Sequence, residues 1–195
     1  MSAVSNTPVA GRSIGSLIGS IAGLVFIVAN AGQLGQPTAL VVRAVGVVAF
    51  LVVLWLAVLR RSARASASGR PERRAMRVYW TCVLAEVIAI PVGVQVVSRG
   101  FGRADLGAVW VVFVVGVHFL PFASAFRAPL FRWLGRTMIV LAVLGGGVAV
   151  LADAAAAPWT AVLAGVVLLG FSLGGRPHVP SGTVLASRGE TAAQA

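Results

Sequence analysis

The chain has 195 residues, of which 58% are hydrophobic and 11% are charged, and its mean hydropathy is +0.95. An ordinary soluble domain is about 25% charged, so a chain with this little charge could not cover its surface in water. The composition excludes a soluble globular domain and predicts a membrane protein, because a bilayer solvates an apolar exterior. The net charge of +11 would suggest nucleic acid in a soluble chain. Here the charges lie between hydrophobic runs, so no nucleic-acid partner is predicted.

Residue usage narrows the chemistry further. All 16 basic residues are arginine, which is typical of GC-rich coding and favours a bacterial source. The single cysteine, Cys82, lies inside an apolar run, so neither an internal disulfide nor a cysteine-based metal site is expected. The sequence contains no P-loop, GxGxxG, HExxH or CxxC motif. We therefore predict no cofactor, no metal and no enzymatic reaction.

Six apolar runs are long enough to cross a bilayer as helices, which takes about 20 residues each. They cover residues 13–32, 38–59, 77–98, 106–126, 137–157 and 158–174. The expected fold is an all-α, polytopic transmembrane bundle of about six spans, forming one domain over 13–175. A leader (1–12) precedes the bundle, and a basic loop (60–76) follows the second span. The tail (176–195) is rich in Pro, Ser and Ala and is predicted to be disordered.

The arginines indicate the orientation. They are concentrated in the connections after the second and fourth spans, whereas the connections after the first, third and fifth spans carry few charges or none. The positive-inside rule places the basic side in the cytoplasm. Both termini are then cytoplasmic, and the predicted location is the plasma membrane of a bacterium, as a multi-pass protein.

The first span carries a stripe of glycines. Gly11, Gly15, Gly19 and Gly23 recur every four residues and fall on one helix face. Small residues at this spacing let helix backbones approach closely in lipid, so Gly15, Gly19 and Gly23 are predicted to pack against another helix, in this chain or in a second one. The span also resembles a signal peptide with Ala29–Ala31 as the cleavage site. Its length and glycine register favour a retained helix.

The third and fourth spans each carry one ionisable side chain deep in an apolar run, Glu86 and His118. Each lies roughly 13–14 Å along the helix from the arginine at the cytoplasmic end of its span, Arg77 or Arg127. Antiparallel neighbours joined by a short turn would bring the two side chains to one depth, near the middle of a hydrocarbon core about 30 Å thick. We expect them to lie within direct or one-water reach and to face the bundle interior, with the other helices packed around this hairpin.

Two interpretations of the pair remain open. It is either a proton-titratable site in a transporter cavity or a buried polar clasp, a kind of contact worth about 0.6 kcal/mol on average. Tyr79 and Cys82 share the helix face of Glu86 and extend the candidate intramembrane site, although Tyr79 also fits an interfacial anchor. Pro91 and Pro121 each free a carbonyl beside the pair. Such carbonyls can bind a cation or be satisfied by neighbouring groups.

A second polar layer is predicted near the outer face. Its members lie within about two helical turns of the outer end of their spans and are Asn30, Arg43, Gln95 and Asp153. Arg43 can pair with Asp153, or it can extend to the lipid headgroups.

Two classes of function are compatible with these features. One is a small transporter or channel, proton-coupled through Glu86 and His118. The other is a non-catalytic structural or assembly protein that packs through glycine-rich helix faces. The predicted partners are the lipid bilayer and, for the second class, a second copy of the chain or another membrane protein. The sequence does not indicate whether the protein has a small ligand.

Overall fold

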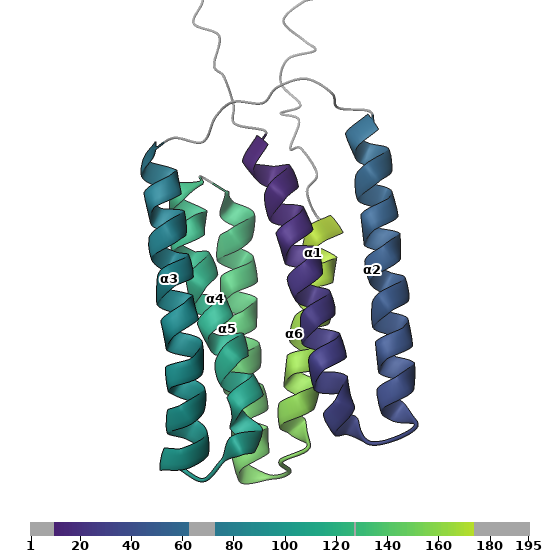
Figure 1. Ribbon diagram of the computed structural model, residues 1–195, viewed down its shortest axis with the longest axis vertical. Helices are drawn as coiled ribbons and strands as arrows, with labels where there is room; N and C mark the ends of the chain where they lie inside the picture. The colour runs from purple at the N-terminus through teal and green to yellow at the C-terminus, as the bar shows by residue number, and fades with distance from the viewer. Residues whose placement is uncertain (1–9, 63–72, 127, 174–195) are drawn as a thin grey trace, which may run out of the picture.

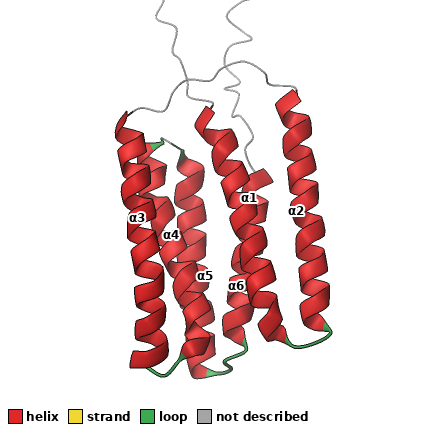
Figure 2. Cartoon of the chain, in the orientation of Figure 1, coloured by secondary structure: helices red, strands yellow, loops and turns green. Residues whose placement is uncertain are grey.

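The computed structural model describes residues 10–62, 73–126 and 128–173, and the fold is that of these residues. They form helices and no strands (Figure 2). The six α-helices are α1 (Ala10–Ala31), α2 (Thr38–Ser62), α3 (Arg73–Gln95), α4 (Gly107–Ala125), α5 (Pro129–Leu151) and α6 (Ala156–Leu173). Each is long and apolar enough to cross a membrane. The predicted all-α class with six candidate spans is therefore confirmed. The leader and the basic loop lie largely outside the described residues, and the tail lies wholly outside them.

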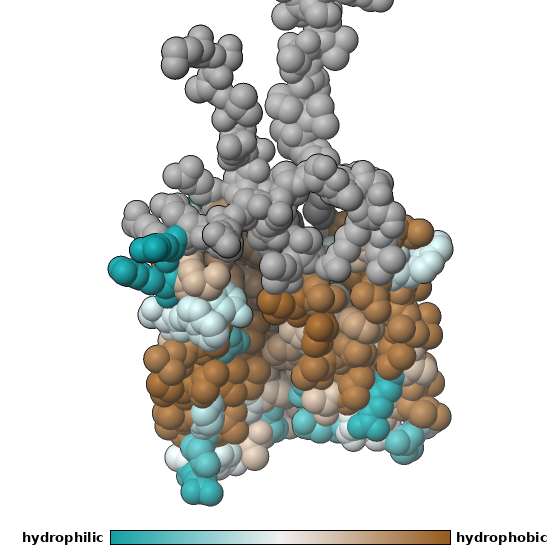
Figure 3. Space-filling view, turned by 45° about the horizontal axis from the view of Figure 1, so that its top comes forward, coloured by the Kyte–Doolittle hydropathy of each residue, from teal (hydrophilic) through white to brown (hydrophobic). Residues whose placement is uncertain are grey.

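The helices form one bundle, in which α2 and α3 stand at opposite edges (Figure 1). Between them, α1, α4, α5 and α6 pack together, and the main cluster of buried side chains comes from these four helices. The first residues of α1 and the last residues of α6 lie at the same end of the bundle (Figure 1). Hydrophobic side chains cover much of the outer surface, and hydrophilic ones gather mainly towards the helix ends (Figure 3).

The prediction that the other helices pack around the α3–α4 hairpin is wrong for α3. This helix packs chiefly against α4, and among its described residues only Ala75 and Gly93 are buried. Its outer flank exposes large apolar side chains such as Leu84 and Ile88. Lipid solvates such a flank as well as a protein neighbour would, so α3 is an edge helix and only α4 belongs to the core.

Glycines set the two most extensive helix crossings, α1 with α6 and α4 with α5. A Cβ atom on Gly23 would lie 2.8 Å from the carbonyl oxygen of Gly165. At the other crossing, a Cβ on Gly135 would lie 2.7 Å from the carbonyl oxygen of Gly116. These distances leave no room for a side chain at either glycine. The helix backbones can therefore approach closely, as small residues at helix interfaces allow.

The fifth helix begins earlier than the sequence indicates. Residues 127–136 were expected to form a basic connection, but α5 starts at Pro129, after an extended Ala128. Proline suits the first helical turn because its missing N–H has no partner there anyway. Arg132 and Arg136 therefore project from a helix rather than from a loop.

The turn between the last two helices also lies earlier than predicted. α5 ends at Leu151 and α6 begins at Ala156, whereas the expected junction was between residues 157 and 158. The Asp153 carboxylate accepts a hydrogen bond of 2.9 Å from the Ala155 N–H. This local bond competes with the helix and favours a turn.

Candidate functional site

The turn between α3 and α4 sets the depth of the polar pair. The chain leaves α3 through a π-helical turn, Val96–Gly100, and enters α4 through a 3-10 turn, Ala104–Leu106. Between them, Gly102 has a φ of 65°, in the left-handed region that favours glycine. The reversal makes α3 and α4 antiparallel neighbours (Figure 1).

Glu86 and His118 meet in the seam between these helices. Glu86 Oε2 lies 3.0 Å from His118 Nδ1, and the side chains are 24% and 11% exposed, respectively. The pair therefore occupies the contact between an edge helix and the core, rather than the centre of the bundle.

The contact is short but poorly aligned. His118 Nδ1 is buried and has no hydrogen-bond partner among the described residues, although the carboxylate oxygen of Glu86 lies within hydrogen-bonding distance. The oxygen must therefore lie off the line of the ring N–H, where a hydrogen bond is weak.

Aromatic rings enclose the histidine side of the pair. The centroid of the His118 ring lies 4.4 Å from that of Phe122 and 5.8 Å from that of Phe119. Phe122 in turn stacks on Tyr79, with 5.8 Å between ring centroids. These rings keep the surroundings apolar, which strengthens an attraction between opposite charges.

Of the remaining predicted members of the site, Tyr79 reaches the pair only through Phe122. Cys82 is half-buried on α3. Within the described ranges, no three His, Cys, Asp or Glu side chains are grouped so that they could hold a metal ion. Pro91 and Pro121 lie inside α3 and α4, and both helices continue through them.

The predicted outer polar layer does not come together. Arg43 Nε donates to the carbonyl oxygen of Val28 at 3.2 Å and so ties α2 to α1. The carboxylate of Asp153 accepts a hydrogen bond from the Ala155 N–H, in the turn before α6. In the part of the chain that the structure describes, the expected pairing of Arg43 with Asp153 does not form: Arg43 bonds to α1 instead, and Asp153 bonds within its own turn.

The other two members of this layer are also separate. Asn30 Nδ2 donates to the carbonyl oxygen of Phe26, one turn back on its own helix, at 2.9 Å. Gln95 is exposed at the end of α3. Among the described residues, none of these four side chains forms a hydrogen bond or an ion pair with another of them.

An ion pair that the sequence does not indicate lies in the turn between α3 and α4. Arg103 Nη2 lies 2.8 Å from Asp105 Oδ2 and donates a second bond of 2.8 Å to the carbonyl oxygen of Ala149, near the end of α5. The hydrogen bond to Asp105 raises the pKa of Arg103. A cation at a helix C-terminus also suits the helix dipole. The arginine therefore fastens the α3–α4 turn to α5.

A second missed contact joins α3 to α4. The indole N–H of Trp110 donates to the carbonyl oxygen of Ala89 at 3.0 Å. Gly93 leaves room for the indole, because a Cβ there would overlap the Trp110 ring. A glycine in one apolar run and a tryptophan in the next are the only sequence signals, and neither indicates its partner.

In general, a carboxyl group and an imidazole in contact can share or exchange a proton. If Glu86 is ionised and His118 is protonated, the seam carries no net charge. Gain or loss of one proton then leaves a single net charge in the seam. A single charge at mid-membrane costs about 2.5–3.5 kcal/mol on insertion scales.

Comparison of the chain with protein-family models, curated proteins and solved structures gives no match. The six apolar helices indicate a multi-pass membrane protein.

Proposed function

We propose that this protein is a small proton-coupled transporter of a bacterial plasma membrane, with Glu86 and His118 as its titratable pair. The observation that carries the proposal is the 3.0 Å contact between the two side chains in the seam between α3 and α4. A polar pair at that place links the protonation state of the protein to the position of one helix.

The coupling follows from how α3 is held. Its main neighbour is α4, so a change in the seam acts on the whole helix. Adding or removing one proton changes the net charge of the seam, at a cost of about 2.5–3.5 kcal/mol. A conformational equilibrium with a gap of a few kcal/mol responds to a bias of that size. Proton binding would thereby favour one position of α3 over another.

The orientation in the proposal has the basic connections and both termini in the cytoplasm. The arginine distribution supports it through the positive-inside rule. The start of α1 and the end of α6 at one end of the bundle are compatible with it (Figure 1).

A flux measurement tests the proposal. The protein is reconstituted into vesicles that contain a pH-sensitive dye, and a pH gradient is imposed across the bilayer. We expect proton flux with the native chain and loss of flux with Glu86→Gln, in protein that stays folded by circular dichroism. Asp153→Asn removes a carboxylate from the exposed turn before α6 and serves as the matched control. Undiminished flux in Glu86→Gln would refute the proposal.

The second candidate is a non-catalytic assembly protein, and one observation favours it. Two open grooves among the described residues are lined mainly by apolar side chains, and neither includes Glu86 or His118. Gly23 already contacts α6 of the same chain, so assembly would use the exposed flanks of α2 and α3 instead. Absence of flux with a stable oligomer in detergent would favour this class.

A further inference from the structure

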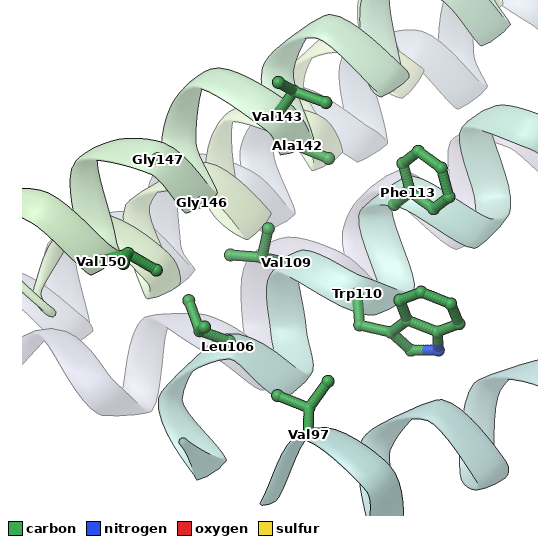
Figure 4. A pocket seen from close by; sticks show the side chains of 10 residues that line it. All are labelled: Val97, Leu106, Val109, Trp110, Phe113, Ala142, Val143, Gly146, Gly147 and Val150. Atoms are coloured by element: carbon green, nitrogen blue, oxygen red, sulfur yellow. The ribbon is translucent and has the colours of Figure 1, made fainter. Parts of the chain in front are cut away.

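The bundle has an open apolar groove between α4 and α5, beside the end of α3. Its volume is about 290 Å³, and its ten lining residues are all apolar. They include Val97, Leu106, Trp110, Phe113, Gly147 and Val150 (Figure 4). We call this surface the α4–α5 groove. It is separate from the Glu86–His118 pair, which does not line it.

Glycine keeps one wall of the groove open. A Cβ atom on Gly147 would meet nothing within 4 Å, so the space above this residue is empty of protein. Leu106 and Val150 lie at one end of the groove, and Phe113 lies towards the other (Figure 4). From Leu106 to Phe113 the groove runs about 10 Å along α4. It therefore covers about a third of a hydrocarbon core about 30 Å thick.

The α3–α4 turn, which adjoins one end of the groove, carries two arginines and one aspartate. The backbone N–H of Arg103 donates to the carbonyl oxygen of Val97 at 3.1 Å, and its Nη2 donates to that of Ala149, the residue before Val150. Arg103 thus adjoins two lining residues. Its Nη1 has no partner among the described residues, and Arg99, in the same turn, is exposed. Asp105 offsets one of these two positive charges.

We propose that the α4–α5 groove binds one acyl chain of an anionic glycerophospholipid, whose phosphate lies against Arg103 and Arg99. The chain would lie along the apolar walls, starting at the level of the headgroups. Lipid tails are as apolar as the groove, so selectivity comes from van der Waals fit and from the charged end. The inference rests on the proposed insertion in a bilayer, but not on transport by Glu86 and His118.

Fluorescence quenching by brominated lipid tests the proposal, because Trp110 lines the groove. Four exposed tryptophans are first changed to phenylalanine so that Trp110 is the only indole; they are Trp55, Trp80, Trp133 and Trp159. This protein is reconstituted with phosphatidylglycerol that carries dibrominated chains. We expect quenching of Trp110, and loss of most of it in Gly147→Phe, whose ring would fill the groove.

The control variant is Gly170→Phe, because Gly170 lies on α6 and also has nothing within 4 Å of a notional Cβ. It should leave quenching unchanged. Equal quenching in the two variants, with equal melting temperatures, would overturn the groove as a chain site. Absence of quenching in every variant would instead refute insertion in the bilayer, on which the inference rests.

The headgroup is tested separately. Brominated phosphatidylglycerol should quench Trp110 more strongly than brominated phosphatidylcholine at the same mole fraction, and Arg99→Gln together with Arg103→Gln should abolish that difference. Equal quenching by the two lipids in the native chain would overturn the phosphate contact. Equal quenching by an uncharged brominated detergent would show that any chain is accepted, and would overturn the assignment to an anionic phospholipid.

Discussion

Gly23 and Gly165 lie against each other where α1 crosses α6, and a Cβ on Gly165 would lie 2.6 Å from the carbonyl oxygen of Gly23. Neither backbone can retreat without separating the helices. Because α6 also packs on α5 and α4, this crossing joins α1 to the rest of the core.

Gly23→Leu should therefore lower the free energy of unfolding by about 1–3 kcal/mol, the usual cost of overpacking. Gly19→Leu should cost less, because a Cβ at Gly19 meets only Ser172 Oγ, at 3.1 Å. Denaturant unfolding in detergent measures both changes. Gly170→Leu, with nothing within 4 Å, should be neutral and is the control. A neutral Gly23→Leu would show that the crossing tolerates a side chain.

Glu86 and His118 should be energetically coupled. Glu86→Gln should destabilise the protein because His118 is then left buried without the carboxylate beside it. Adding His118→Phe should restore part of the loss. A double-mutant cycle measures the coupling, which is about 0.5–3 kcal/mol for residues in contact. Strictly additive losses would show that the 3.0 Å contact contributes nothing to stability.

Trp110→Phe should loosen α3, because it removes the hydrogen bond to Ala89. Intramembrane hydrogen bonds average about 0.6 kcal/mol and reach about 1.7 kcal/mol, so we expect a loss of unfolding free energy in that range. Gly93→Ala should cost more, because its Cβ would displace the indole. The exposed Trp80 supplies the control Trp80→Phe. If Gly93→Ala were as stable as the native protein, α3 would not be docked on α4 as described.

The orientation predicts where reporter fusions become active. Fusions after Gly69 and within the tail should report the cytoplasm, and a fusion near Gly102 should report the outside. An external signal from the Gly69 fusion would reverse the orientation. It would leave the helix packing untouched, since packing does not depend on which side is the cytoplasm.

The helices are predictable from the sequence because a bilayer-spanning run needs length and apolarity, and both are local properties. Helix rise alone places Glu86 and His118 at one depth. The start of α5 is missed because Arg132 and Arg136 suggest a loop, although a helix in the headgroup region carries arginine readily. Pro129 is the better local signal for the helix start.

The neighbours of each helix are not predictable in the same way. In water, an apolar stripe shows which helix face is buried, but in lipid both faces are apolar. Nothing in α3 therefore distinguishes the flank that faces lipid from the one that faces α4. The hydrogen bond between Trp110 and Ala89 cannot be predicted from the sequence either, because its acceptor is a backbone carbonyl and every residue has one. Arg103 is missed because its acceptor on α5 is distant in sequence.

The pairing of α1 with α6 bears on the order in which the chain is built. Among the described helices, synthesis delivers α1 first and α6 last, so Gly23 cannot meet Gly165 until α6 has been made. A chain truncated before α6 would deprive α1, α2 and α5 of a shared neighbour. The crossing of α1 with α6 can therefore form only after α6 has been synthesised, so the packing of the first described helix depends on the last.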